Sequence, residues 1–296
     1  MIKKEIRNRR VAWEIMRKAK YRDRRLSDVT AEIFRREGDN INDQDRRFIT
    51  LLVQGTVRLS GRLDWELRQV FIGEYDELKD SLRILLRLGT YQLFYMNSIP
   101  DYAAVTTTVQ LAKKIHPNLG GLTNAVLRTL INLEERNLPD EHTPVSILAD
   151  YLSHPEWLIN KWIKDQNYEK ARALAEWNNE NPQLWFRVNR LEYTPTKFKN
   201  YLKKHEIKFE QFEFIPEFFQ TWKHQELIKS DIFREGKISI QDPAAGLVVK
   251  LVDPQKNESI IDACAAPGGK SSYAAELLKN TGSILSLDSN EKRLDH

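Results

Sequence analysis

The chain has 296 residues, of which 41% are hydrophobic and 30% charged, a composition typical of a globular protein with two or three domains rather than a disordered or fibrous one. The formal net charge is +4 and there is a single cysteine, so an internal disulfide is excluded and clustered cysteines do not indicate zinc. No apolar stretch reaches the ~18 residues that a membrane span requires, and no apolar signal segment follows the basic start. We therefore expect a cytoplasmic protein without a membrane partner. We also expect a monomer without a bound metal.

The positive charge is concentrated at one end of the chain. Residues 1–25 contain eleven Lys or Arg residues and three acidic ones, a local charge of +8, so the other 271 residues carry a net −4. Such a block indicates an anionic partner such as nucleic-acid phosphate, but a solvated helix face gives the same pattern, and the residues alone leave both interpretations open. The candidates for phosphate contacts are Arg7, Arg9, Arg10, Arg17, Lys18 and Lys20.

Residues 1–138 show the periodicity of an all-α domain with six to eight helices. Apolar residues and glycines recur at spacings of three and four, which places each set on one helix face. The sets are Ala12, Ile15, Met16 and Ala19; Leu26, Val29 and Ile33; Phe48, Leu51, Leu52 and Gly55; and Leu82, Leu85, Leu86 and Gly89. Gly55 would let a neighbouring helix approach closely, and a helix end is the alternative. Two more helices are expected at about 101–115 and 121–135.

The next segment is a predicted helical linker, residues 139–182. Pro155 suits the first turn of a helix that carries Trp157 and Trp162. Their helical spacing favours packing in a core or between domains over stacking on RNA. His154 is interpreted as a turn or capping residue, since it has no partner motif. Residues 183–240 predict a small α+β subdomain, with a strand at 184–189, a helix at 194–205 and a β-favouring aromatic cluster at 209–222.

Residues 241–296 contain one βαβ unit, the start of an α/β Rossmann-like domain. The predicted order is a strand at 259–263, a loop at 265–270, a helix at 271–279 and a strand at 283–288. Asp288 ends the second strand, 20 residues after Gly268, where a carboxylate can accept hydrogen bonds from the ribose hydroxyls of a nucleoside cofactor.

The loop between these strands can be compared with three kinds of ligand site: a dinucleotide site, a P-loop and an S-adenosylmethionine site. A dinucleotide site needs Gly-x-Gly-x-x-Gly, which is absent, and a P-loop would need glycine at position 264, which is Cys264. An S-adenosylmethionine site needs neither, and an ordinary βα turn without a ligand is the remaining alternative. Lys270 is a candidate for contact with cofactor or RNA, against the alternative of a solvated lysine at a helix start.

The run Asp262 to Lys270 (DACAAPGGK) closely resembles the cofactor motif of the RNA cytosine-5 methyltransferases of the NOL/NOP/Sun group. Residues 240–245 resemble the segment that leads into the catalytic domain of that group. The linker and subdomain of its RsmB (Sun/Fmu) type are resembled by residues 153–155 with Trp157, by residues 178–179 and by residues 187–189. Segments of the helical domain resemble a NusB-type RNA-binding domain, at residues 45–47, 53–58, 63–65, 87–93 and 124–128. The resemblance covers essentially the whole chain.

This resemblance implies methylation of cytosine C5 in small-subunit (16S) ribosomal RNA, with S-adenosylmethionine as methyl donor. It implies cofactor contacts from Cys264, Ala265, Ala266, Pro267, Gly268, Gly269, Lys270 and Asp288. The nucleophilic cysteine of the group lies in a Thr-Cys motif, and a second, assisting cysteine lies in a Pro-Cys motif; this sequence contains neither. Cys264 is therefore not the nucleophile, no catalytic residue is expected in this chain, and we interpret it as C-terminally truncated and inactive alone.

Two other functions remain as alternatives. The first is a non-catalytic NusB-like RNA-binding protein, and the second is a P-loop nucleotidase, which Cys264 disfavours. A two-stranded piece of a Rossmann-like sheet also buries little apolar surface, so we expect residues after about 257 to be weakly stabilised in the isolated chain.

Overall fold

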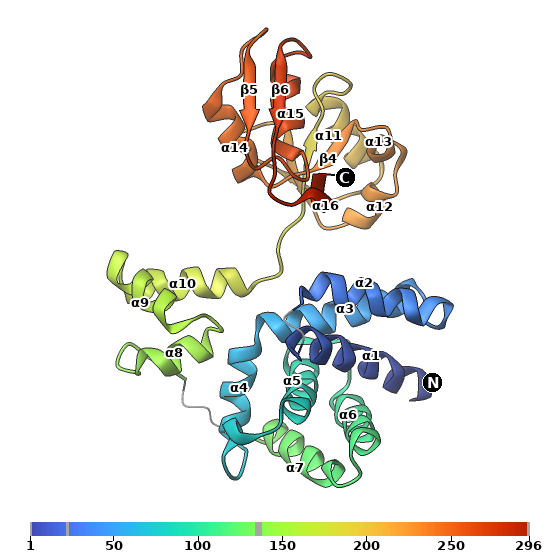
Figure 1. The fold of residues 1–296 in the computed structure, drawn as a ribbon, viewed down its shortest axis with the longest axis vertical. Coiled ribbons are helices and arrows are strands. Elements are labelled where there is room, and N and C mark those ends of the chain that lie inside the picture. The colour runs from blue at the N-terminus through green and yellow to red at the C-terminus, as the bar shows by residue number, and fades with distance from the viewer. Residues whose placement is uncertain (1, 22–23, 134–137, 295–296) are drawn as a thin grey trace. The chain divides into compact units, whose positions relative to one another are not determined.

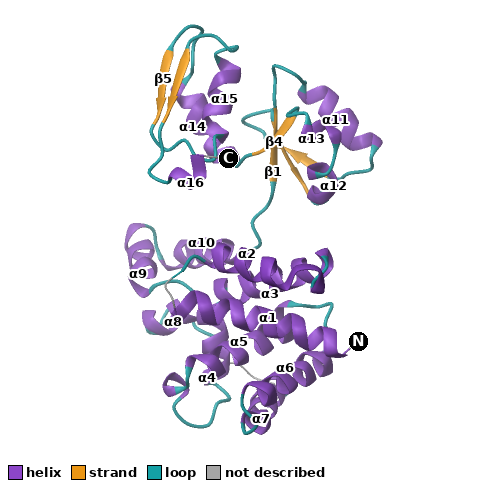
Figure 2. Cartoon of the chain, turned by 45° about the vertical axis from the view of Figure 1, so that its right-hand side comes forward, coloured by secondary structure: helices purple, strands orange, loops and turns teal. Residues whose placement is uncertain are grey.

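The computed structural model describes residues 2–21, 24–133 and 138–294 and divides into two compact units, residues 1–180 and 181–296 (Figure 1). Within its described residues the N-terminal unit contains helices and no strands, as the periodicity predicts (Figure 2). The same residues include no helix that is both long and apolar enough to cross a membrane. The helices are α1 (Ile2–Tyr21), α2 (Leu26–Glu37), η1 (Gly38–Asn40), α3 (Asp43–Arg58), α4 (Ser60–Arg68), η2 (Tyr75–Glu77), α5 (Asp80–Tyr95), α6 (Asp101–Ile115), α7 (Leu119–Ile131), α8 (Val145–Tyr151), α9 (Glu156–Asp165) and α10 (Tyr168–Asn179).

The core of the N-terminal unit lies where the apolar periodicity places it. Ile15 of α1 and Ile33 of α2 are fully buried in one cluster with residues of α3 and α5. A Cβ added to Gly55 would lie 2.0 Å from Cζ of Tyr91 on α5, so the close approach of α3 and α5 requires glycine, which confirms that expectation. The apolar periodicity does not indicate α4, although Leu63 of that helix is also fully buried.

A pair of local hydrogen bonds determines where α3 begins. Asn42 accepts a hydrogen bond from the backbone N–H of Asp45 at 2.9 Å, and the Asp45 carboxylate accepts one from the Asn42 N–H at 3.3 Å. This capping box starts α3 by satisfying donors that have no partner within the helix.

The last three helices of this unit, α8 to α10, pack in a small cluster that also includes Trp65 of α4. Ile159 is fully buried there, and Trp162 packs against the same cluster. Trp157 is 67% exposed, so it does not pack in the core of this unit, and its packing between domains stays a prediction. The Nδ1 atom of His154 lies 2.5 Å from the carbonyl oxygen of Leu152. The backbone N–H of His154 donates to the carbonyl of Ala149, as expected for a turn residue.

The C-terminal unit combines a four-stranded antiparallel sheet with a two-stranded parallel one (Figure 2). The sheet order is β2-β3-β1-β4 in the first and β5-β6 in the second. The elements are β1 (Trp185–Val188), α11 (Pro195–Lys204), β2 (Phe209–Gln211), β3 (Phe218–Thr221), α12 (His224–Ile228), α13 (Asp231–Arg234), β4 (Ile238–Ile240), α14 (Pro243–Val252), β5 (Ser259–Asp262), α15 (Gly269–Leu277), β6 (Ser283–Ser286) and α16 (Glu291–Leu294).

Both faces of the four-stranded sheet are covered. Phe186 and Phe219, which are direct partners across β1 and β3, pack in a cluster with side chains of α11, α12 and α13. On the opposite face Phe218 packs with Val249 of α14 and Tyr273 of α15. Successive residues of a strand point to opposite faces, so β1 contributes side chains to both clusters.

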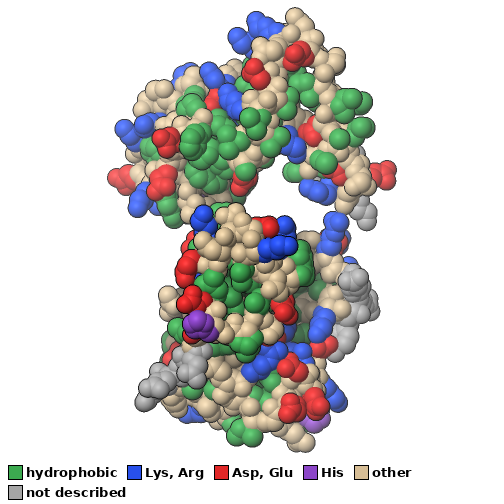
Figure 3. Space-filling model, turned by 90° about the vertical axis from the view of Figure 1, so that its left-hand side faces the viewer, with side chains coloured by type: hydrophobic (Ala, Val, Ile, Leu, Met, Phe, Trp, Pro, Cys, Tyr) green, Lys and Arg blue, Asp and Glu red, His purple; other side chains and the backbone are tan. Residues whose placement is uncertain are grey.

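The β5–β6 pair is less well covered than the four-stranded sheet. Ile261 is 68% exposed and Leu285 is 55% exposed, while Ile260 and Ile284 pack against the α14–α15 cluster. On α14, Leu251 is 85% exposed. Hydrophobic side chains are visible in patches on the surface of the C-terminal unit in Figure 3. One face of this parallel pair is therefore largely open to solvent.

Candidate functional site

The loop singled out in the sequence lies at the carboxyl edge of the two parallel strands. Strand β5 ends at Asp262, α15 begins at Gly269, and β6 ends at Ser286, two residues before Asp288. The strands pair in register from Ser259 with Ser283 to Asp262 with Ser286, so both carboxylates lie at the same edge. Ligands of open α/β sheets bind at this edge.

Asp288 is joined directly to the loop. One carboxylate oxygen accepts a hydrogen bond from the backbone N–H of Ala266 at 3.1 Å, and the other accepts one from the N–H of Asn290 at 2.9 Å. The hydrogen bond from Asn290 holds the pKa of Asp288 below its ordinary value, with a further contribution from Ala266. The side chain is therefore an ionised, partly exposed acceptor beside the loop.

The loop has a compact conformation that leaves room beside its glycines. Ala265 and Ala266 are buried, and the N–H of Gly268 donates to the carbonyl of Ala265 at 2.6 Å. Gly268 has φ of 99° and no neighbour within 4 Å of where a Cβ would stand. This backbone conformation favours glycine, and it leaves open space next to the first turn of α15.

Lys270 folds back over the loop rather than extending into solvent. Its Nζ donates to the carbonyl of Cys264 at 2.9 Å, and Cys264 itself is exposed. A cavity of about 260 Å³ lies next to these two residues, between α14 and β5, and its wall is mostly apolar. The structure thus gathers the predicted loop residues, Lys270 and Asp288 around one edge of the sheet.

Two further residues belong to this site and were not among its predicted members. Asp262 accepts hydrogen bonds from the hydroxyl of Ser271 at 2.7 Å and from the N–H of Cys264 at 3.2 Å. It therefore links the end of β5 to the first turn of α15. The signal in the sequence was the position of Asp262 at the end of an apolar run, directly before the loop. Arg293 also donates to the carbonyl of Ala266 at 3.0 Å, and nothing in the sequence indicated this contact.

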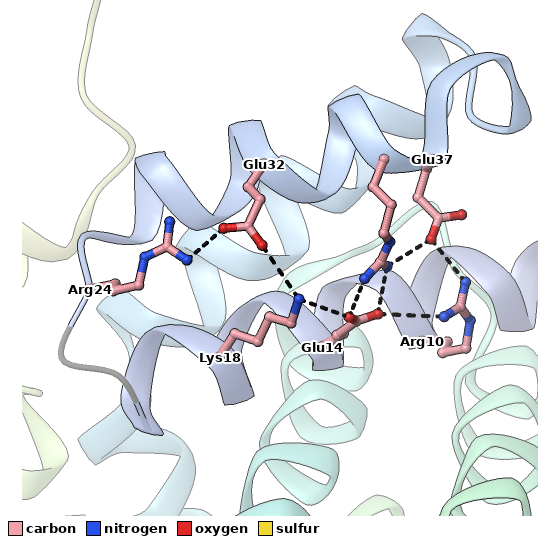
Figure 4. Close-up of polar contacts among 7 residues, drawn as sticks. Arg10, Glu14, Lys18, Arg24, Glu32 and Glu37 are labelled. Atoms are coloured by element: carbon pink, nitrogen blue, oxygen red, sulfur yellow. Dashed lines mark hydrogen bonds and ion pairs between the residues drawn. The ribbon is translucent and has the colours of Figure 1, made fainter.

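The six basic residues predicted to contact phosphate all lie on α1, in different surroundings. Arg7 forms an ion pair with Asp45 at 3.2 Å, and Lys20 forms one with Asp80 at 2.5 Å. Arg10 and Lys18 contact Glu14 and also glutamates of α2, in the network of ion pairs that Figure 4 shows. Much of the local charge of +8 is thus balanced within the folded unit.

The other two of these residues, Arg9 and Arg17, differ in their exposure. Arg9 is only 5% exposed, donates to the carbonyl of Glu5 at 3.1 Å and lies over the ring of Phe48. Burial lowers the pKa of Arg9 to about 10. Arg17 is exposed, with its guanidinium 5.0 Å from the ring centre of Trp13. A phosphate at α1 could therefore reach Arg17 more easily than Arg9.

Within the residues that the structure covers, no cluster of three or more His, Cys, Asp or Glu side chains could hold a metal ion. Cys264 is the single cysteine of the chain and its side chain lies in the exposed loop.

Three protein families match successive parts of the chain. The NusB family matches residues 7–132, the ferredoxin-like domain of RsmF/B-type methyltransferases matches residues 154–220, and the 16S rRNA methyltransferase RsmB/F family matches residues 249–296.

Curated relatives match most of this chain and a little over half of their own length. A probable ribosomal RNA small subunit methyltransferase B of Bacillus subtilis (strain 168) is 34% identical over 253 residues, which cover 85% of this chain and 56% of the relative. The ribosomal RNA small subunit methyltransferase B of Yersinia enterocolitica (serotype O:8 / biotype 1B) is 32% identical over 260 residues, covering 86% of this chain and 58% of that protein. The crystal structure of the protein PH0851 shares the fold, with a TM-score of 0.66 and 22% identity, over 99% of this chain and 65% of that one.

Proposed function

The chain belongs to the RsmB/F methyltransferase family, with a NusB-type domain before its ferredoxin-like segment, and from this premise we propose that it serves the S-adenosylmethionine-dependent methylation of cytosine C5 in small-subunit (16S) ribosomal RNA. The names of the relatives support ribosomal RNA as substrate class. The C5 position rests on the resemblance of residues 262–270 to the cofactor motif of cytosine-5 methyltransferases.

The single observation that carries this proposal is the placement of Asp288 beside the loop at the carboxyl edge of β5 and β6. An ionised carboxylate that already accepts two backbone hydrogen bonds keeps lone pairs for two ribose hydroxyls. Gly268 leaves open space next to the free backbone N–H groups at the start of α15. Because the loop lacks the Gly-x-Gly-x-x-Gly pattern of a dinucleotide site, these residues fit S-adenosylmethionine better than a pyrophosphate.

Each loop residue has a proposed part in this site. Asp288 would hold the ribose hydroxyls, and residues 264–270 would pack against the methionine part of the cofactor. Lys270 is 2.9 Å from the carbonyl of Cys264, so it would fix the loop and place a positive charge near the carboxylate of the bound methionine moiety.

Bound S-adenosylmethionine would supply an electrophilic methyl group. Cytosine C5 becomes nucleophilic only after a thiolate adds to C6. We do not assign that step to Cys264, because it lies in the cofactor loop and not in the Thr-Cys motif that carries the nucleophile of the group. The role of this chain in the proposed reaction is to bind the cofactor and the RNA.

Equilibrium binding of S-adenosylmethionine to the 296-residue chain tests the proposal. Asp288→Asn should weaken binding about tenfold or more, since a hydrogen bond to a charged group contributes roughly 1.5–3 kcal/mol. Glu213→Gln, which removes the same charge from an exposed residue of the same unit, should leave the affinity unchanged. Binding of ATP with magnesium instead would favour a nucleotidase, and binding of RNA without either ligand would favour a non-catalytic RNA-binding protein.

We also propose that α1 contributes phosphate contacts to the complex with ribosomal RNA. The exposed position of Arg17 and the buried position of Arg9 sharpen this proposal. Arg17→Gln should lower the slope of log affinity against log salt by up to ~1, while Arg9→Gln should change the slope little. An unchanged slope after joint replacement of Arg10, Arg17 and Lys18 would contradict RNA binding by this helix.

A further inference from the structure

Arg187 occupies an unusual place for a charged residue, in the middle of a strand that is buried on both faces. In β1, Phe186 and Val188 point to the cluster shared with α11, α12 and α13. Arg187 points the other way, to the face where Phe218 and Tyr273 pack, and its side chain is only 1% exposed. Burying a guanidinium is strongly unfavourable unless it is paired and hydrogen-bonded.

All three nitrogens of the Arg187 guanidinium have partners. Nη1 pairs with the Glu276 carboxylate, which is itself buried, and Nη2 donates to the hydroxyl of Ser272 at 3.1 Å. Nε donates to the side-chain oxygen of Gln241 at 2.6 Å. The guanidinium also lies 4.6 Å from the ring centre of Tyr273.

These partners connect β1 to the helix that follows the cofactor loop. Ser272, Tyr273 and Glu276 all belong to α15. The second oxygen of Glu276 accepts a hydrogen bond from the backbone N–H of Arg190 at 3.1 Å, which gives α15 a second attachment just after β1. The four-stranded sheet thus holds α15 along more than one turn.

Gln241 extends this connection to the beginning of α15. Its side chain is buried, and its Cδ and Nε2 lie 3.6 and 3.7 Å from where a Cβ of Gly269 would stand. Its Nε2 has no hydrogen-bond partner among the residues that the structure describes. Arg187 donates to the oxygen of the Gln241 amide, so it determines how this amide lies against Gly269, the first residue of α15.

We propose that Arg187 is a positioning residue for the cofactor site, which fixes the first turn of α15 through Ser272 and Gln241 and so keeps the loop in its binding conformation. This inference rests on the proposed function, because it assumes that the loop binds S-adenosylmethionine. Ser271, the neighbour of Ser272, holds Asp262 at 2.7 Å, so a shift of this turn would reach the end of β5. Replacement of a buried ion pair by apolar residues of similar volume is often neutral or stabilising, so stability alone does not explain the pair.

The test compares a single and a double variant with the wild-type chain. Arg187→Met leaves the Glu276 carboxylate buried without its partner, so both the melting temperature and the affinity for S-adenosylmethionine should fall. Arg187→Met with Glu276→Met removes both charges and should recover the melting temperature. The affinity of the double variant should stay roughly tenfold below that of the wild type, as expected when an outer hydrogen-bonding partner of a ligand site is lost. Arg234→Met, at an exposed position of α13 in the same unit, is the matched control and should bind like the wild type.

Amide hydrogen exchange of residues 269–274 separates this inference from the proposed function. Faster exchange there in the double variant, at an unchanged melting temperature, supports positioning whether or not the chain binds the cofactor. If the wild type fails to bind S-adenosylmethionine, the proposed function fails, and this exchange measurement alone decides the role of Arg187. Recovery of both the affinity and the exchange protection in the double variant would show a purely structural pair and overturn the inference.

Discussion

The two units of this protein each contain a group of arginines and glutamates, but the groups differ in their access to water. The α1–α2 network lies at the surface of the N-terminal unit and comprises Arg10, Glu14, Lys18, Arg24, Glu32, Arg36 and Glu37 (Figure 4). The Arg36 side chain is 45% exposed and that of Glu14 is 14% exposed, whereas those of Arg187 and Glu276 are 1% and 6% exposed.

This difference in exposure changes what an ion pair contributes. In the α1–α2 network water and salt screen each pair, so each member can be replaced at a small loss of stability. At Arg187 no water replaces a missing partner, so removing one charge leaves the other unpaired in the interior. The surface network adds small increments to the docking of α2 on α1, while the buried pair specifies one arrangement of α15 on the sheet.

The largest expected effect follows from removing one side of the buried pair. Glu276→Leu leaves the guanidinium of Arg187 buried without a carboxylate, and we expect the free energy of unfolding of the C-terminal unit to fall by ~3–5 kcal/mol. Urea denaturation followed by circular dichroism measures this loss. Glu235→Leu, an exposed glutamate of the same unit, is the control, and an equal loss in both variants would remove the distinction between buried and exposed pairs.

A smaller effect is expected at a partly buried ion pair within the N-terminal unit. Arg87 donates from Nε to Asp64 at 2.7 Å, and the Tyr75 hydroxyl donates to the same carboxylate at 2.5 Å. Tyr75→Phe removes one hydrogen bond to a charged group but keeps the pair, so the free energy of unfolding should fall by ~1.5–3 kcal/mol. Thermal unfolding of the variant checks this value. A loss as large as that of Glu276→Leu would show that the ion pair itself had been disrupted.

Glu14→Gln should lower the free energy of unfolding by less than about 1 kcal/mol, because solvent screens the ion pairs of the partly exposed α1–α2 network. The hydrogen bond from Arg36 lowers the pKa of Glu14 below its ordinary value of 4.5. A carboxyl group with a lowered pKa contributes stability above its ordinary pKa and loses it as the pH falls through the lowered value. The difference between wild type and Glu14→Gln, measured by urea denaturation, should therefore be present at neutral pH and disappear in acid.

Glu276 should show the opposite dependence on pH. Burial raises the pKa of Glu276 above 4.5, in spite of Arg187. Folding then favours the protonated form, so the stability gained from the raised pKa is full below pH 4.5 and is lost as the pH rises through the raised value. The pairing with Arg187, which Glu276→Leu removes, is a separate contribution. Amide exchange of α15 and α2, corrected for the intrinsic rate at each pH, should reveal opposite trends in the acid range. Parallel trends in the two helices would contradict this difference.

The smallest expected effect is that of salt. Raising the ionic strength to ~1 M shortens the screening length to about 3 Å and should reduce the contribution of Glu14 by a few tenths of a kcal/mol. The destabilisation caused by Glu276→Leu should not change beyond the general effect of salt on the wild type. Repeating the two denaturation series at low and high salt measures both effects together.

Elements of the fold could be predicted where the signal is local in the sequence. The spacing of Ala12, Ile15 and Met16 determined a buried helix face, and the order of strand, loop, helix and strand around Gly268 determined a βαβ unit with Asp288 at its edge. Periodicity and turn residues act over a few positions of the chain, so they are visible without the tertiary structure.

The partners of the charged residues could not be predicted in this way. The basic block of residues 1–25 gives no sign that Asp45 and Asp80, from α3 and α5, would pair with Arg7 and Lys20. These partners depend on which helices pack against α1. The positive electrostatic potential at the surface of α1 is thus lower than the number of Lys and Arg residues indicates.

The sequence by itself determined the family, the helical character of residues 1–180 and the position of the cofactor loop, because each is encoded in consecutive or regularly spaced residues. Only the tertiary structure decided which face of β1 is covered by α14 and α15, and hence that Arg187 lies in the interior with Glu276 of α15 as its partner. An arginine in a strand usually indicates a solvent-exposed face. Packing between elements distant in the chain reverses that expectation here, because it removes water from both faces of the sheet and leaves the charge only protein groups to pair with.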